Sequence, residues 1–408
     1  MARLMAIPAF RVLRYPDFRW LWIGAFLSFT GSQIQNVAQG FYVYQLTGDK
    51  TKLALVAFCL FIPMSLLAPF SGAIADIFHK RTIIVVAMLV NAASALFVAV
   101  SYSLGTLQYW HLLAAALLTG VMQTVEAPAR QSIVRLVVPA HDFPSAIPAQ
   151  ALTFNLARVA GPAIGGVLAD RYGAGACFYV NAASFLGLIF AAFAIRADLS
   201  PAEREPQPIW DLLTEGMRYT FLNRALRTLF IMEAATSFCA FHISQMPAIA
   251  KSMLGLGAQG LGWCYSAVGI GAILGLLTLG AVSHLPYKPI LVRASMALVA
   301  IAMIAIGFVR EVWIALPLLG LLGFGTIMQF NTTNTLFQLM SPPHLRGRVI
   351  SMHLWALAGL APPGILLFGW LAEVSGLPRS FWIAGGCLLA MTIWAYIRRG
   401  DIFEPELS

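Results

Sequence analysis

The sequence predicts an all-α membrane protein in which twelve transmembrane helices form two pseudo-symmetric six-helix bundles. Hydrophobic residues make up 59% of the 408 residues and charged residues 11%, whereas an ordinary soluble chain contains roughly 25% charged residues. Apolar stretches long enough to cross ~30 Å of hydrocarbon recur along the whole chain. A polar segment at 196–225 leaves six of these stretches on either side, which is the basis for predicting two bundles.

The polar segment is expected to be a cytoplasmic linker between an N-terminal bundle, 1–195, and a C-terminal bundle, 226–408. Within it, apolar and polar residues alternate at helical spacing over 209–222, which predicts an amphipathic helix at the membrane surface. The twelve predicted membrane helices are 18–46, 51–75, 82–101, 110–137, 145–169, 174–195, 226–250, 256–280, 288–308, 312–339, 345–372 and 380–398.

The formal net charge of +9 arises from 26 lysines and arginines, most of which lie on one side of the predicted membrane. Because basic residues concentrate in cytoplasmic loops, this asymmetry predicts that both termini are cytoplasmic. We attribute the positive charge to this bias, since no soluble domain presents a basic surface. The lipid bilayer is therefore an expected partner and nucleic acid is not.

Enzyme and metal chemistry find no support in the sequence. The five cysteines all fall in apolar stretches, and their spacing matches neither a metal site nor a disulfide framework. No Gly-x-x-x-x-Gly-Lys-Ser/Thr loop is present to bind a nucleotide, which argues against direct use of ATP. We therefore expect no catalytic residue, no metal and no cofactor.

The two halves of the chain repeat each other. The stretch 72–80 matches 280–288 at an offset of 208 residues. A second set matches at an offset of 203 residues, in which Gly161, Gly166, Asp170 and Gly173 correspond to Gly364, Gly369, Glu373 and Gly376. Two bundles related by an axis along the membrane normal are the layout of a large class of transporters.

The connection between predicted helices 2 and 3 carries a motif. Gly72, Asp76 and the basic pair Lys80 and Arg81 resemble the 2–3 loop motif of the major facilitator superfamily, although Phe78 stands where a glycine is usual. The resemblance implies a conformational latch, in which Asp76 accepts hydrogen bonds from the start of helix 11 or from a nearby arginine. The alternative is a solvated loop that only sets the topology.

Predicted helix 5 carries a second motif. Gly161, Pro162, Gly165 and Gly166 are similar to the helix-5 motif of exporters and antiporters in the same superfamily. The resemblance implies a tight domain interface that limits leak. Packing between neighbouring helices is the alternative, because small residues let membrane helices approach closely.

Three further stretches resemble a narrower branch, which contains the enterobactin-type siderophore exporters and the macrolide efflux pumps. They are 128–134, 181–185 and 345–349. Membership implies a multi-pass protein of a bacterial cytoplasmic (inner) membrane. It also implies a monomeric secondary active transporter, which exports an amphipathic small organic molecule, a drug or a siderophore, in exchange for protons by alternating access. The alternatives are an importer or lipid carrier, and a non-transporting membrane receptor on the same scaffold.

Polar side chains follow helical spacing on three of the helices that line the cavity in this superfamily. Gln35 and Gln39 lie on predicted helix 1, Glu233 on helix 7, and Asn331 and Asn334 on helix 10. We expect these residues to contact the substrate or, for Glu233, a proton. Hydrogen bonding between helices is the alternative.

Charged residues inside predicted helices 4 and 5 are the main candidates for a functional site. Glu126 and Arg130 lie in helix 4, and Arg158 lies near the centre of helix 5. Charges at this depth cost about 2.5–3.5 kcal/mol on insertion scales and usually face each other or a water-filled cavity. We expect a proton or the substrate to compete for Glu126. The alternative is a static pair of Glu126 with Arg158 or Arg130 that only holds the helices together.

Overall fold

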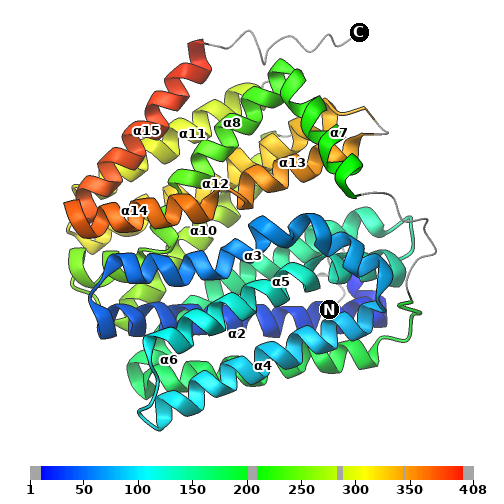
Figure 1. Ribbon diagram of the computed structural model, residues 1–408, viewed down its shortest axis with the longest axis horizontal. Coiled ribbons are helices and arrows are strands. Elements are labelled where there is room, and N and C mark those ends of the chain that lie inside the picture. The colour runs from blue at the N-terminus through cyan, green and yellow to red at the C-terminus, as the bar shows by residue number, and fades with distance from the viewer. Residues whose placement is uncertain (1–10, 201–208, 283–287, 343–344, 398–408) are drawn as a thin grey trace. The chain divides into compact units, whose positions relative to one another are not determined.

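The computed structural model describes residues 11–200, 209–282, 288–342 and 345–397. Every regular element in these ranges is a helix (Figure 1). The helices form two compact units. The described residues of unit 1 are 11–46, 66–200 and 257–266, and those of unit 2 are 47–65, 209–256, 267–282, 288–342 and 345–397.

Unit 1 is built around long membrane helices. Helix α4 packs along both α5 and α6 (Figure 1). A short 3-10 helix, η2 (Val12–Arg14), precedes them. The helices are α2 (Pro16–Thr47), α3 (Lys50–Ile77), α4 (Lys80–Ser103), α5 (Tyr109–Val137) and α6 (Phe143–Ala194). The part of α3 that precedes residue 66 belongs to unit 2, whereas the start of α10 belongs to unit 1.

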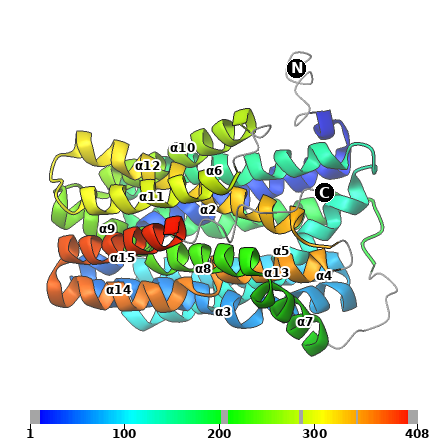
Figure 2. The same ribbon diagram turned by 90° about the horizontal axis from the view of Figure 1, so that it is seen from above.

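Unit 2 contains the remaining helices, in which α8 packs against α13, α14 and α15 (Figure 2). Helix α11 packs between α12 and α15. The elements are α7 (Ile209–Leu222), α8 (Arg224–Cys239), η3 (Phe241–Ile243), α9 (Met246–Ala248), η4 (Ile249–Met253), α10 (Ala258–Val282), α11 (Lys288–Ile306), α12 (Val312–Leu339), α13 (Arg346–Ala358), α14 (Ala361–Ser375) and α15 (Leu377–Ile397).

In the part of the chain that the structure describes, nine helical stretches are long and apolar enough to cross a membrane. One of them, Ser145–Ala194, consists of two helices that meet at a kink at Gly173. The predicted all-α membrane fold is therefore confirmed.

Two predicted helices are not continuous, and the prediction is wrong in this detail. Within 226–250, α8 ends at Cys239 and is followed by a 3-10 turn and, at Ile249–Met253, by a π-helix. Within 345–372, α13 ends at Ala358 and α14 begins at Ala361 with Pro362 in its first turn. Proline lacks a backbone N–H and favours the first turn of a helix over its interior, which explains the second break.

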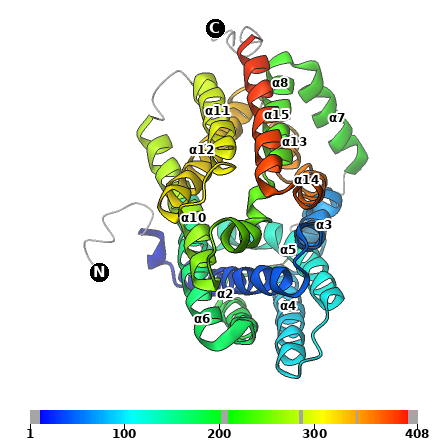
Figure 3. The ribbon, with the colours of Figure 1, turned by 90° about the vertical axis from the view of Figure 1, so that its left-hand side faces the viewer.

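The helix α7 has the bounds of the predicted amphipathic helix and packs against α13 and α8 (Figure 3). Gly216 allows this contact, because a Cβ atom there would lie 2.7 Å from the carbonyl oxygen of Arg348. Glu215 forms an ion pair with the side chain of Arg348. The polar linker thus ends in a helix attached to unit 2.

A polar contact fixes η2 against the start of α6. Asp142, which precedes α6, accepts hydrogen bonds from the Tyr15 hydroxyl at 2.7 Å and from Arg14 at 2.5 Å. The Tyr15 hydrogen bond and the Arg14 guanidinium hold the pKa of Asp142 below its usual value. The carboxylate therefore stays charged and ties η2 to the beginning of α6.

Two repeat-related glycines turn the chain between consecutive helices. Gly173 interrupts α6 with φ 79°, and Gly376 separates α14 from α15 with φ 90°. Residues other than glycine are strained in this left-handed region because Cβ crowds the backbone. The same conformation therefore occurs at corresponding points of the two halves.

Replacing Gly173 by alanine should lower stability by about 1–2 kcal/mol, because the strain lies in the backbone. The nearest atom to a Cβ there, the Tyr102 hydroxyl at 3.5 Å, leaves room for it. Gly386→Ala is the matched control, since a Cβ at Gly386 meets no atom within 4 Å and its backbone is helical. Thermal unfolding in detergent measures both. An equal melting temperature for Gly173→Ala and the wild type would contradict the assignment of backbone strain to position 173.

Candidate functional site

Glu126 and Arg130 form a buried ion pair within α5. Their side chains are one helical turn apart, the Arg130 Nε donates to Glu126 Oε1 at 2.7 Å, and each residue is 4% exposed. The spacing i, i+4 brings such side chains together on one face of a helix. Of the two arginines considered as partners, the structure therefore pairs Glu126 with Arg130.

Two aromatic rings, whose centroids are 4.0 Å apart, lie next to the guanidinium of Arg130. Phe29 from α2 lies 4.8 Å from it and Phe154 from α6 lies 5.0 Å from it. The faces of aromatic rings attract a cation, and more strongly where water is excluded. Arg130 thus connects α5 to two neighbouring helices through the rings and not through a salt bridge.

Arg158 lies near the middle of the first part of α6. It is 15 residues after Phe143 and 15 before Gly173, about 22 Å from either end at 1.5 Å per residue. Its side chain is exposed, and among the described residues it makes no hydrogen bond or ion pair. The structure therefore does not bring Arg158 and Glu126 together as a pair.

A second buried ionisable pair occurs in unit 2. Glu233 on α8 lies 2.7 Å from Nδ1 of His353 on α13, and the two residues are 0% and 3% exposed. The other carboxyl oxygen, Oε1, is buried with no hydrogen-bond partner in the described structure. Sequence reasoning missed His353, because 120 residues separate it from Glu233 and no local spacing relates them.

Of the polar residues predicted to line a cavity, those on α2 are buried and those on α12 are partly exposed. Gln35 accepts a hydrogen bond from Asn181 of α6 at 2.7 Å and bonds to Gln39 at 3.3 Å, so this pair lies buried between helices. On α12, Asn331 bonds to the backbone of its own helix, and Asn334 accepts from Gln338. Both asparagines are partly exposed, and polar groups at membrane depth face protein or water in preference to lipid.

The basic residues of the 2–3 loop motif bind the segment that follows α6. Lys80 donates to the carbonyl oxygen of Ser200 at 2.9 Å, and Arg81 donates to that of Ile195 at 2.7 Å. The surroundings of Gly72 and the side chain of Asp76 lie outside what the structure describes. The latch thus remains a prediction.

The helix-5 motif lies where other helices approach α6 closely. A Cβ at Gly165 would lie 2.9 Å from the Cα of Ile34 on α2, and one at Gly161 would lie 2.5 Å from the Cβ of Gln33. On another side, a Cβ at Gly166 would lie 2.8 Å from the carbonyl oxygen of Ala258, at the start of α10. Pro162 meets α10 at Gly262. All four motif residues therefore take part in helix packing within unit 1.

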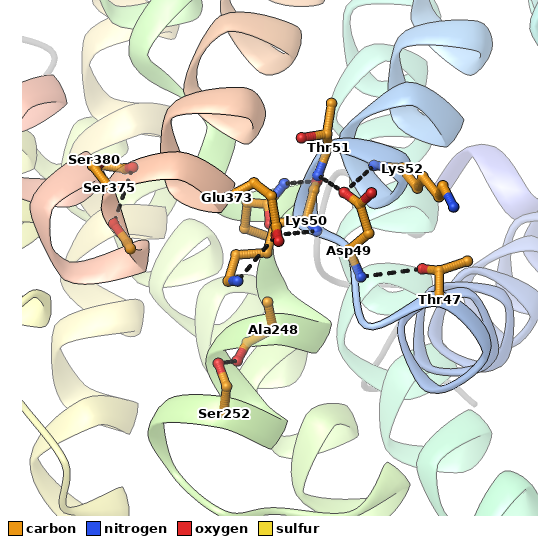
Figure 4. Close-up of polar contacts among 12 residues, drawn as sticks. Thr47, Asp49, Lys50, Thr51, Lys52, Ala248, Ser252, Glu373, Ser375 and Ser380 are labelled. Atoms are coloured by element: carbon orange, nitrogen blue, oxygen red, sulfur yellow. Dashed lines mark hydrogen bonds and ion pairs between the residues drawn. The ribbon is translucent and has the colours of Figure 1, made fainter.

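An ion pair connects α3 to α14 within unit 2 (Figure 4). The carboxylate of Glu373 accepts from the backbone N–H of Lys50 at 2.9 Å and from its Nζ at 3.1 Å. Gln245 donates to the carbonyl oxygen of Lys50 at 3.0 Å. These contacts lie at the N-terminal end of α3 and the C-terminal end of α14.

Metal chemistry gains no support from the described residues, which contain no group of three or more histidine, cysteine or acidic side chains able to hold an ion. The ionisable residues at membrane depth are instead arranged singly or in pairs.

The model of the transmembrane secretion effector family matches residues 7–404. The chain belongs to this family. It is therefore a major facilitator transporter and a multi-pass membrane protein, and not an enzyme.

Similar members of the family act in efflux and in siderophore transport. The staphyloferrin A transporter of Staphylococcus aureus is 23% identical over 93% of this chain and 95% of its own length. The multidrug efflux pump Tap of Mycolicibacterium fortuitum is 25% identical over 86% and 88%. The macrolide efflux protein A of Streptococcus pyogenes is 20% identical over 92% and 94%.

Solved structures show the same fold at low sequence identity. A POT family transporter in complex with a thioalcohol-conjugated peptide matches with a TM-score of 0.78 and 14% identity, covering 95% of this chain and 96% of that one. The nucleoside transporter NupG matches with a TM-score of 0.74 and 14% identity, covering 95% and 99%. These structures show the fold, and the family match confirms the resemblance to the major facilitator superfamily.

Arg130→Leu should destabilise this family member strongly, by roughly 3–5 kcal/mol, because it leaves the buried Glu126 carboxylate without its partner. The double variant Glu126→Leu with Arg130→Leu removes both charges and should unfold at a higher temperature than Arg130→Leu alone. Lys50→Leu is the control, since its ion-pair partner Glu373 has a 39% exposed side chain. Additive effects of the two α5 substitutions on the melting temperature would show that the pair is not coupled.

Proposed function

We propose that the protein is a proton-coupled exporter that moves an amphipathic small organic molecule across the membrane by alternating access. Efflux is the activity that the names of several relatives state, and the drug- and siderophore-transporting relatives align over most of the chain. In this proposal the protein works as a monomer in the bacterial inner membrane, with both termini in the cytoplasm.

The buried pair of Glu233 and His353 is the observation that supports proton coupling. Carboxylate and imidazole both exchange protons, and at 2.7 Å they share a hydrogen bond. A proton added to the pair would enter a region from which water is excluded, where a change of charge strongly affects the surrounding packing. Glu233 Oε1, which has no hydrogen-bond partner in the described structure, offers the proton a place to bind.

Glu126 is the second acidic residue in the proposal. Its partner is an arginine, a residue type that keeps its charge in proteins, and two aromatic rings lie next to the Arg130 guanidinium. Protonation of Glu126 would leave the buried Arg130 cation uncompensated. We therefore propose that Glu126 keeps Arg130 in place, and that the proton exchanges at Glu233 and His353.

The close packing around the helix-5 motif fits alternating access. Gly161 and Gly165 bring α6 against α2, and Gly166 brings it against the start of α10. A surface without long side chains can separate and close again without repacking of rotamers. We propose that the packing of α6 against α2 and α10 limits leak across the membrane while these helices are closed against one another.

The direct test is uptake of a panel of drugs and siderophores into inside-out vesicles, with and without a proton gradient. Gradient-driven accumulation inside such vesicles corresponds to efflux from the cell. Accumulation only in right-side-out vesicles would identify an importer. Binding without gradient-driven flux would identify a receptor, and either result would overturn the proposal.

Glu233→Gln and His353→Gln should each abolish gradient-driven accumulation but retain exchange of cargo across the membrane without a gradient. Exchange survives because it needs the binding site but no net proton movement. Glu311→Gln is the matched control, since Glu311 is exposed before α12. Glu126→Gln, assayed alongside, should keep the pH dependence of the wild type. Wild-type accumulation by Glu233→Gln would exclude Glu233 as the proton carrier.

A further inference from the structure

Arg158 differs from Glu126, Arg130 and Glu233, because no described side chain forms an ion pair or a hydrogen bond with it. Acidic residues are absent from the whole of α10, and the single one on α2, Asp17, lies in its first turn. The acidic residue of α5, Glu126, is already bonded to Arg130. This region therefore carries one uncompensated positive charge, which is the sum over Glu126, Arg130 and Arg158.

Arg158 lies on the face of α6 that packs, further along the helix, against α2 and α10. Gly161, Pro162 and Gly165 follow it at three, four and seven residues, so all four lie on one side of the helix. The last three pack against α2 and α10. Where this packing ends, the same face of α6 presents Arg158, together with the 38% exposed ring of Phe154.

From these observations we infer that Arg158 binds an anionic group of the transported molecule, a carboxylate or a group of similar charge. The exposed ring of Phe154, one turn away, contacts the apolar part of the same molecule. A guanidinium suits this role because it donates in a planar fork that matches a carboxylate. The inference rests on the proposed efflux function and defines its substrate class as amphipathic anions.

The membrane potential makes an anionic cargo physically reasonable. The cell interior is negative, so an anion that leaves the cytoplasm moves down the electrical gradient. Protons that enter in exchange move in the favourable direction as well. Both components of the proton gradient would then drive export, whereas a cationic cargo would leave against the potential.

Two dyes that share a xanthene ring system provide the test. Carboxyfluorescein is anionic and rhodamine 123 is a cationic ester, so they differ mainly in charge. Inside-out vesicles containing the full chain should accumulate carboxyfluorescein under a proton gradient, and faster when the vesicle lumen is made positive with potassium and valinomycin. Arg158→Gln should lose this uptake, and Arg158→Lys should keep part of it.

The controls separate this inference from the function on which it rests. Arg310→Gln makes the same charge change at an arginine that bonds only to nearby backbone carbonyls in the described structure, and it should transport as the wild type does. Thermal unfolding should show Arg158→Gln to be folded, since Arg158 has no partner to lose among the described residues.

Uptake of carboxyfluorescein by Arg158→Gln at the wild-type rate would overturn the role of Arg158. Wild-type transport of rhodamine 123 without transport of carboxyfluorescein would overturn the substrate class but leave efflux standing. Gradient-driven movement of neither dye would contradict the proposed efflux function itself, and the inference would then fail with it.

Discussion

A charge placed inside a membrane protein needs a partner, and this requirement organises the interior of the molecule. Glu126 and Arg130 pair with each other within one turn of α5, and the rings of Phe29 and Phe154 lie next to the guanidinium of the arginine. Glu233 meets the requirement across two helices, through His353. Arg158 does not meet it with any described side chain, so the partner in our account is the cargo.

These arrangements differ in what they allow chemically. A carboxylate with an arginine is a fixed charge pair, because the arginine keeps its proton. A carboxylate with a histidine can exchange a proton, because both side chains have a protonated and a deprotonated form. The two pairs lie in different units, Glu126 in unit 1 and Glu233 in unit 2. In our account, cargo binding belongs to unit 1 and proton exchange to unit 2.

Much of the fold could be predicted because hydropathy and length are local properties of the sequence. Hydropathy and length alone do not show the helix breaks after Cys239 and Ala358, although Pro247 and Pro362 lie at the start of the helices that follow them. The pairing of Glu126 with Arg130 follows from i, i+4 spacing, whereas His353 reaches Glu233 only through the packing of α13 on α8. The position of Arg158 along its helix follows from the sequence, but its lack of a partner among the described residues depends on which helices face it.

The account is tested most directly by infrared difference spectroscopy of the purified transporter during a pH titration, which detects protonation of individual carboxyl groups. We expect a carboxyl signal in the wild type that disappears in Glu233→Gln and persists in Glu126→Gln. Loss of the signal in Glu126→Gln and its survival in Glu233→Gln would contradict the division between a fixed pair and a proton-exchanging pair.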